Sequence, residues 1–252
     1  MAGERLYILT GASRGLGRGI AEQLLTAGTT LLALSRTPDT SLEGVASNAE
    51  ARLEQWAVDV SQVAVAERLE QWLSGSDAKR WSSATLINNA GVIGAVGPIT
   101  GASAETLVAA FRINLEGPLL LTRAFLRATR GWAIDKRVLN ISSGAAHRAV
   151  AGWAAYCATK AGLDHFSRVV ALDEALLANP ARVVSLAPGV IDTDMQSALR
   201  AADAASFPEH HVFVELKASG QLPSPAAAAQ RVLAYLARAD FGAKPVADVR
   251  DT

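Results

Sequence analysis

Three residues in the middle of the chain have the types and the spacing of an acid–base catalyst. Tyr156 and Lys160 lie four positions apart, so on a helix their side chains share one face, one turn apart. A free phenol has a pKa of about 10, and a nearby ammonium lowers that pKa by favouring the phenolate. Ser143 follows the apolar run 138–141, so a strand ending there would present its hydroxyl at the carboxyl edge of a sheet. Taken alone, the Tyr–Lys pair is more typical of a solvated surface pair, and the other motifs decide between the two interpretations.

A glycine-rich stretch near the start of the chain has the context of a dinucleotide-binding turn. The stretch 10–17, TGASRGLG, follows the apolar run 6–9 and precedes a helical pattern that ends at Gly28. With the next strand expected over 30–34, the glycines lie inside one βαβ unit. Small residues there let backbone amides approach a pyrophosphate at the positive end of a helix. The expected cofactor contacts in this turn are Gly11, Ser13, Arg14, Gly15, Leu16 and Gly17.

The end of the second strand indicates which dinucleotide binds. Ser35 and Arg36 stand where an acidic residue would bind the ribose hydroxyls of NAD. With Arg14 in the glycine turn, two guanidinium groups are available, and guanidinium binds phosphate through paired donors. We therefore predict NADP(H), although both arginines are also explained as solvated surface charges.

Further expected contacts lie at the ends of the third and fourth strands. Asp59 and Val60 stand at the end of the third strand, where the Asp59 carboxylate would accept from the adenine amino group. The same carboxylate is also explained as an N-terminal acid ahead of the helix 63–73. In the stretch LINNAG, the Asn88 and Asn89 amides need hydrogen-bond partners to be buried. The cofactor contacts expected in that stretch are Asn89, Ala90 and Gly91, the last two leaving room for a ribose.

Asn114 falls inside a long helical pattern over 104–130, where asparagine is unfavourable by propensity. Two interpretations remain open for it. The side chain either bonds a neighbouring backbone carbonyl for packing, or orders a water for proton transfer.

The stretch after the sixth strand is expected to cross the nicotinamide, with the Thr193 hydroxyl reaching the cofactor. The expected contacts there are Pro188, Gly189, Val190, Ile191 and Thr193. A substrate flap is expected over about 192–224, and its part 196–223 shows little regular pattern. The pair His210–His211 lies in it without an evident third ligand, so no metal site is predicted.

Strand and helix patterns alternate along the whole chain, which predicts an α/β protein with a single doubly wound parallel sheet flanked by helices, a Rossmann fold. We expect one domain over 1–252. Surface loops are expected over 37–49 and 74–83. The predicted strands are 6–9, 30–34, 56–60, 86–91, 138–141 and 183–186, with a last short one within 242–252. The predicted helices are 20–28, 63–73, 104–130, 153–177 and 225–238.

Composition narrows the classes of function. The 252 residues carry 24 basic and 24 acidic side chains, so no basic surface for nucleic acid or an anionic membrane is indicated. No apolar run approaches the roughly 18 residues of a membrane-spanning helix. Cys157 is the single cysteine, which excludes an intramolecular disulfide. We expect a cytoplasmic protein whose partner is a small molecule, with neither nucleic acid nor membrane.

Taken together, the motifs resemble the short-chain dehydrogenase/reductase family. The matching stretches are TGASRGLG, Asp59, NNAG at 88–91, Asn114, Ser143, YCATK at 156–160 and PGVIDT at 188–193. The resemblance implies a catalytic tetrad of Asn114, Ser143, Tyr156 and Lys160. It also implies a homodimer or homotetramer, for which the helices over 104–130 and 153–177 are the candidate contacts.

Within the family, the chain is most similar to sepiapterin reductases and bacterial benzil reductases. The stretches that carry this resemblance are GWAAYCATKAGLD, APGVIDTDM, LKASGQL at 216–222 and the ending VADVRD. The resemblance implies that an acid near the C-terminus holds a pterin ring, which would be Asp248 or, with one shift in alignment, Asp251. Asp248 is equally explained as an exposed tail acid. Trp153 is a candidate for the substrate pocket wall by position, beside Ser143 and Tyr156.

These observations predict an NADPH-dependent carbonyl reductase. Its ketone would be a pterin side chain of the sepiapterin type or a vicinal diketone such as benzil. Two alternatives remain open: a non-catalytic NADP(H)-binding sensor, which would not need the serine, tyrosine and lysine together, and an NAD-dependent alcohol dehydrogenase, against which Ser35 and Arg36 argue.

Overall fold

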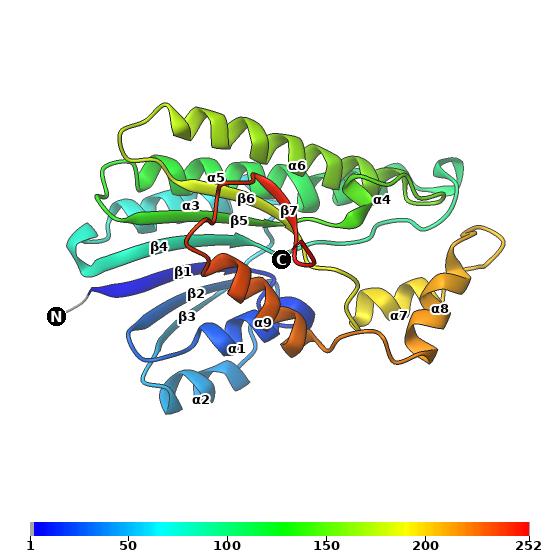
Figure 1. Ribbon diagram of the computed structural model, residues 1–252, viewed down its shortest axis with the longest axis horizontal. Helices are drawn as coiled ribbons and strands as arrows, with labels where there is room; N and C mark the ends of the chain where they lie inside the picture. Colours follow the sequence, from blue (N-terminus) through cyan, green and yellow to red (C-terminus); the bar gives the residue numbers. More distant parts are fainter. Residues whose placement is uncertain (1–2, 252) are drawn as a thin grey trace.

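Seven parallel strands form one sheet in the computed structural model, which describes residues 3–251 (Figure 1). Their order is β3-β2-β1-β4-β5-β6-β7, so the chain reverses its direction of winding between β1 and β4. This confirms the predicted doubly wound Rossmann fold. The strands are β1 Glu4–Thr10, β2 Thr29–Ser35, β3 Arg52–Ala57, β4 Trp81–Asn88, β5 Asp135–Ile141, β6 Arg182–Ala187 and β7 Val246–Asp248.

Helices cover both faces of the sheet. One face carries α1 Gly15–Leu24, α2 Ser41–Asn48 and α9 Pro225–Leu236, and the other carries α3 Val63–Ser74, α5 Gly117–Ala128 and α6 Ala154–Ala175 (Figure 1). Alternate residues of β2 serve the two cores: Leu31 and Ala33 pack on the first face, Leu32 and Leu34 on the second. A strand buried on both sides must be apolar throughout, which explains the unbroken apolar run in the sequence.

The remaining helices lie beyond the carboxyl ends of the strands. They are α4 Ala104–Phe111, α7 Asp194–Arg200 and α8 His210–Ala218, with the last two standing apart from the sheet at one end of the molecule (Figure 1). A third, smaller core joins this end to the start of α6, and its aromatic members are Trp153, Tyr156, Phe207 and Phe213. Open α/β sheets bind ligands at this edge.

Three predicted irregular regions contain regular structure. The expected loop 37–49 holds α2, because Leu42 and Ala46 are four residues apart and both bury against the first core. The expected loop 74–83 ends in β4, which begins at Trp81. The expected irregular stretch 196–223 holds most of α7 and all of α8. These helices are short and mostly exposed, so their sequence periodicity is weak.

Two predicted boundaries also differ. The third strand runs over Arg52–Ala57, earlier than the expected 56–60, because its exposed and buried residues alternate at the sheet edge where no continuous apolar run is needed. Asp59 and Val60 therefore follow the strand. The expected single helix 104–130 is divided into α4, a π-helical turn over Arg112–Glu116, and α5, which ends at Ala128.

Within residues 3–251, no helix combines the length and the apolar composition that a membrane crossing requires.

Candidate active site

The predicted acid–base residues meet at the carboxyl edge of β5. Tyr156 and Lys160 lie on the first turns of α6 and are both buried, at 7% and 5% exposed. Nζ of Lys160 donates a hydrogen bond of 2.8 Å to the Ile141 carbonyl at the end of β5, and lies 5.8 Å from the centre of the Tyr156 ring. Ser143 follows that strand end, and its hydroxyl lies close enough to the Tyr156 phenol to lower the pKa of that group. The three side chains therefore share one site.

Burial determines the protonation of this pair. It raises the pKa of Tyr156, and the Ser143 hydroxyl opposes the rise only in part. The expectation that a neighbouring ammonium lowers this pKa is therefore wrong for the protein by itself, because desolvation of the phenolate outweighs the favourable interactions. Burial also lowers the pKa of Lys160 to about 8. A phenol that keeps its proton is suited to donate it.

Asn114 occupies the π-helical turn and is fully buried. Its Oδ1 accepts from the backbone N–H of Val92 at 2.8 Å, and its Nδ2 donates to the Val92 carbonyl at 2.7 Å and to Oγ1 of Thr159 at 3.3 Å. The first of the two interpretations, a bond to a neighbouring backbone carbonyl, is therefore confirmed. These bonds hold the turn against both the segment after β4 and the helix that carries Lys160. The ordering of a water by Asn114 stays a prediction.

Gly91 lies between Asn114 and Lys160. A Cβ added there would lie 3.3 Å from Oδ1 of Asn114 and 3.8 Å from Nζ of Lys160. Glycine at this position lets the backbone pass close to both side chains, beside the place where a ribose is expected.

The glycine turn is closely packed against the end of β4. A Cβ added at Gly17 would overlap the carbonyl oxygen of Gly11, and Gly11 itself has φ +69, a conformation that favours glycine. Nδ2 of Asn89 donates to the carbonyls of Thr10 and Gly11, at 3.0 and 3.3 Å. Asn89 therefore holds the turn in place from the neighbouring strand. This turn leads into the N-terminus of α1, a position that suits a pyrophosphate.

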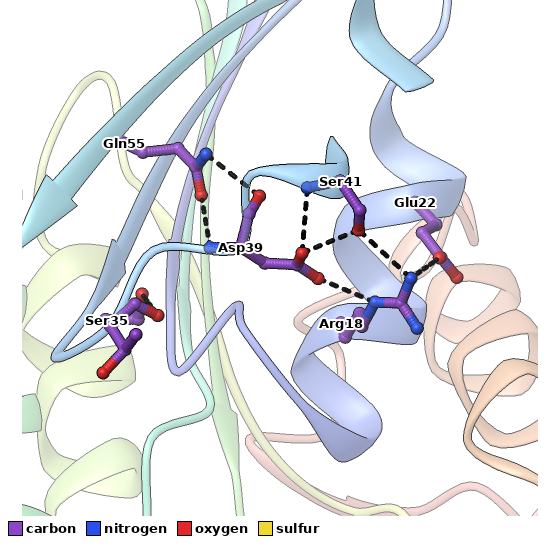
Figure 2. Close-up of polar contacts among 7 residues, drawn as sticks. Arg18, Glu22, Ser35, Asp39, Ser41 and Gln55 are labelled. Atoms are coloured by element: carbon purple, nitrogen blue, oxygen red, sulfur yellow. Dashed lines mark hydrogen bonds and ion pairs between the residues drawn. The ribbon is translucent and has the colours of Figure 1, made fainter. Parts of the chain in front are cut away.

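In the loop after β2, an acid that the sequence interpretation missed is held by several hydrogen bonds from the protein (Figure 2). Oδ2 of Asp39 accepts from Nε of Arg18 at 2.8 Å, and Oδ1 accepts from the backbone N–H and hydroxyl of Ser41 at 3.0 and 2.6 Å. The Ser41 hydroxyl, followed by Arg18, lowers the pKa of Asp39. Gln55 of β3 bonds the Asp39 backbone at both its N–H and its carbonyl. Asp39 thus already accepts three hydrogen bonds from Arg18 and Ser41.

Arg36, by contrast, is exposed and has no hydrogen-bond or ion-pair partner among residues 3–251. The Arg36 guanidinium acts on the carboxylate of Asp59. The pKa of Asp59 is lowered first by the backbone N–H of Ser61, at 2.9 Å, and also by Arg36. Ser35, next to it, is buried and donates its hydroxyl to the Thr37 carbonyl at 3.0 Å (Figure 2). The strand end thus offers a free cation and a bound acid.

The stretch after β6 reaches back to the glycine turn. The Thr193 methyl lies 3.4 Å from where a Cβ of Gly15 would stand. Arg14 pairs with Asp194 of α7 at 3.6 Å, so its guanidinium lies toward the flap. Gly189 has φ +79, and Ile191 is buried while Val190 is partly exposed. Thr193, one of the predicted nicotinamide-side residues, therefore lies directly beside the glycine turn.

A charged pair that the sequence interpretation missed fixes the flap to this stretch. Nζ of Lys217, on α8, donates to Oδ2 of Asp192 at 2.6 Å, and Arg200 lies 3.8 Å from the other oxygen. These residues line a pocket of about 340 Å³ with Gly15 and Thr193. Lys217 belongs to the LKASGQL stretch, which resembles sepiapterin and benzil reductases, but that resemblance does not indicate the contact with Asp192.

Of the two predicted substrate residues, Trp153 is at the site. Its ring packs edge-on against Tyr156, with centres 5.6 Å apart, and stacks on Phe207 at 5.4 Å. Its buried indole N–H has no hydrogen-bond partner among the described residues. This N–H belongs to a ring that contacts the Tyr156 ring directly.

Asp248 lies in a different place. Both of its oxygens are bound by the Arg250 guanidinium, at 2.7 and 2.5 Å, and it lines a pocket of about 640 Å³ with His147, Arg168 and Asp251. In the described part of the chain, neither Tyr156 nor Trp153 lines that pocket. A role for either tail acid with substrate stays a prediction.

Comparison with known proteins gives the class of this protein. The family model for short chain dehydrogenases matches residues 5–204. A benzil reductase ((S)-benzoin forming) of Bacillus cereus is 37% identical over 238 residues, covering 94% of this chain and 96% of that protein. A sepiapterin reductase of Xenopus laevis is 36% identical over 207 residues, covering 77% of this chain and 76% of that protein.

A solved structure of a short-chain dehydrogenase/reductase from Burkholderia vietnamiensis has a TM-score of 0.64, with 36% identity, over 100% of this chain and 99% of that one. The chain belongs to the short-chain dehydrogenase/reductase family. It is therefore an oxidoreductase that acts on a carbonyl or alcohol group with a nicotinamide cofactor.

Proposed function

We propose that the protein is an NADPH-dependent reductase of ketones, with a vicinal diketone such as benzil as its preferred substrate class. The observation that carries this proposal is the buried meeting of Ser143, Tyr156 and Lys160. The preference for a diketone over a pterin rests on the relatives: the benzil reductases of Bacillus cereus and Bacillus subtilis are 37% and 39% identical to this chain, whereas the sepiapterin reductase of Rattus norvegicus, which matches a similar share of it, is 33% identical.

The residues present fit a dinucleotide with a 2′-phosphate. The Gly11–Gly17 turn at the start of α1 suits the pyrophosphate, and the side-chain-free backbone of Gly91 beside Lys160 suits the nicotinamide ribose. Free Arg36 suits the 2′-phosphate, and the only nearby acid on the same stretch, Asp39, is already neutralised by Arg18. The bound cofactor supplies a hydride to the ketone carbon.

In this mechanism the side chains of the chain handle the proton. Oγ of Ser143 accepts from the backbone N–H of Ala145 at 3.2 Å, so its own hydrogen is left to donate to the carbonyl oxygen of the substrate. Tyr156, whose pKa is raised by burial, gives its Oη proton to the alkoxide. Lys160, charged over most of the neutral range, stabilises the phenolate that remains.

The second carbonyl of a diketone has a possible partner in Trp153. The indole N–H is buried and unpartnered, and a buried donor without an acceptor costs about 1–3 kcal/mol. An acceptor on the substrate would remove that cost. The aromatic side chains around it suit the phenyl rings of benzil.

The test of the substrate class is the loss of NADPH absorbance with benzil and with sepiapterin, each with NADH as a parallel cofactor. We expect turnover of benzil with NADPH. Turnover of sepiapterin alone would instead favour the pterin side chain and make Asp248→Asn and Asp251→Asn the next variants. Equal rates with NADH would contradict the cofactor assignment.

Replacement of Tyr156 by Phe tests the mechanism. It removes only the proton donor, so we expect turnover to fall at least about 1000-fold while the dissociation constant for NADPH stays within about twofold. NADPH fluorescence measures the binding. A variant that keeps a tenth of the activity would refute the mechanism, and wild-type protein that binds NADPH but reduces no ketone would favour the sensor alternative.

A further inference from the structure

A buried carboxylate that the proposed mechanism does not use lies one helical turn beyond Lys160. Asp164 is 1% exposed and stands four residues after the lysine on α6. Its Oδ1 accepts from the hydroxyl of Ser142 at 2.5 Å and from that of Ser185 at 2.6 Å. Ser142 follows β5 and Ser185 lies in β6, so one oxygen joins two neighbouring strands beneath the active site.

The second oxygen of Asp164 is buried as well, and a half-exposed histidine lies beside it. Oδ2 lies 3.1 Å from Nε2 of His147, an ion pair whenever the imidazole is protonated, and it has no hydrogen-bond partner among residues 3–251. His147 is half exposed and follows the short turn after Ser143. One oxygen of this buried carboxylate is therefore held by two neutral hydroxyls, and the other lies beside a half-exposed histidine.

The charges around this carboxylate come from three elements. Lys160 lies on the same helix, and the charge of Asp164 raises the pKa of that lysine against the effect of burial. His147 approaches from the loop before α6. On the far side of His147, Asp248 of β7 is paired with Arg250, and the histidine adds to the lowering of the Asp248 pKa. Two serine hydroxyls cannot neutralise a buried charge, so the compensating cation is Lys160, with His147 adding to it whenever its imidazole is protonated.

We propose that Asp164 is the buried counter-ion of Lys160 and a positioning residue for the reaction, with His147 balancing the same carboxylate from the solvent side. This inference rests on the proposed reductase function, because Lys160 acts on Tyr156. Asp164 makes no contact with substrate in this scheme. It keeps the lysine charged to a higher pH and fixes the strand end whose Ile141 carbonyl holds the lysine.

The proposal predicts a change in the shape of a pH profile. Burial lowers the pKa of Lys160 to about 8, and the charge of Asp164 keeps this pKa from falling further. Ketone reduction needs charged lysine, so it is fully active below that pKa and declines as pH rises through it. Loss of the carboxylate should lower this pKa further, so the charged fraction falls several-fold at about pH 8 and hardly changes at about pH 6.

The test is the Asp164→Asn variant, whose Oδ1 can still accept from both serine hydroxyls. We expect its alkaline limb of kcat to move to lower pH, with a rate near that of the wild type at about pH 6. The matched control is Asp173→Asn, which removes an exposed acid from the same helix and leaves the profile unchanged. A loss by the same factor at every pH, or an unchanged profile, would overturn the proposal.

Two further measurements keep the proposal testable if Asp164→Asn does not fold. His147→Lys places a permanent cation beside the carboxylate at a half-exposed position, and we expect a smaller shift of the alkaline limb in the same direction. An unmoved limb in this variant would count against the proposal.

NADPH affinity, measured by fluorescence, is a readout that does not need turnover. Charged Lys160 is expected to bind the ribose, so NADPH affinity should decline at alkaline pH. In both variants this decline should move to lower pH. An unmoved decline would overturn the inference. Absence of ketone turnover in the wild type would refute only the proposed function, since the fluorescence titration would still decide on Asp164.

Discussion

The two halves of the active site are built in opposite ways. The cofactor half, around the glycine turn and β4, depends on missing side chains: Gly11, Gly17 and Gly91 leave room where any Cβ would contact a neighbouring atom. The substrate half depends on side chains that fill space. Trp153 packs against Tyr156 of α6 and against Phe207 and Phe213 of the expected flap, with ring centres between 5.4 and 5.6 Å apart.

This difference determines which substitutions each half can tolerate. A backbone groove is fixed by strand ends and hydrogen bonds such as those from Asn89, and it recognises what all members of a cofactor class share. An aromatic cluster can exchange one ring for another and still remain packed. The cofactor half should therefore fail abruptly on the smallest substitution, and the substrate half should change its affinity by degrees.

The largest effect is expected for Gly17→Ala. The added Cβ would overlap the Gly11 carbonyl and the Asn89 amide, so the turn must move away from the pyrophosphate position. We expect NADPH affinity to fall about 100-fold or more, as fluorescence titration would show. Gly44→Ala on α2 is the control, because nothing lies within 4 Å of its added Cβ. Normal cofactor binding by Gly17→Ala would show that the glycine turn is not rigid and would remove the contrast.

A smaller effect is expected for Arg36→Leu, which leaves the groove intact and removes one charge. A charged hydrogen bond is worth about 1.5–3 kcal/mol, so affinity for NADPH should fall about 10- to 100-fold. Affinity for NADH and KM for the ketone should not change. Arg52→Leu, at the start of β3, removes another exposed arginine and serves as the control. An equal loss for NADPH and NADH would mean that Arg36 does not contact a 2′-phosphate.

The sequence predicts the cofactor half well because its signals are local. The turn from Gly11 to Gly17, the strand before it and the helix after it are contiguous in the chain, and the Tyr156–Lys160 spacing is a single helical turn. The parallel, doubly wound sheet follows from the alternation of strands and helices. What spacing alone misses is the acid Asp39: it lies only four residues after Ser35, but its binding to Arg18 depends on how α1 packs beside the following loop.

The substrate half could not be predicted in the same way, for physical reasons. The helices α7 and α8 are short, so their periodicity is indistinct. The contact of Trp153 with Phe207 joins segments more than fifty residues apart, and nothing in either segment specifies the other. The direction of the Tyr156 pKa was also wrong from sequence, because the cost of burying the phenolate depends on how completely the flap and α6 cover it.

The smallest effect is expected for Phe213→Ala, which tests the substrate half directly. Phe213 is buried against Trp153 and Phe207, whereas its neighbour Val214 is exposed. Removing the ring leaves a cavity that loosens the flap without touching the groove, so KM for the ketone should rise about tenfold and the NADPH dissociation constant should stay within about twofold.

Val214→Ala on the same helix is the matched control and should change neither constant. The informative alternative is a parallel loss of NADPH affinity in Phe213→Ala. That result would mean that α8 transmits the change through the Lys217–Asp192 pair to Thr193, which packs against Gly15. The two halves would then be one coupled unit, and a double variant with Lys217→Met would lose no further cofactor affinity.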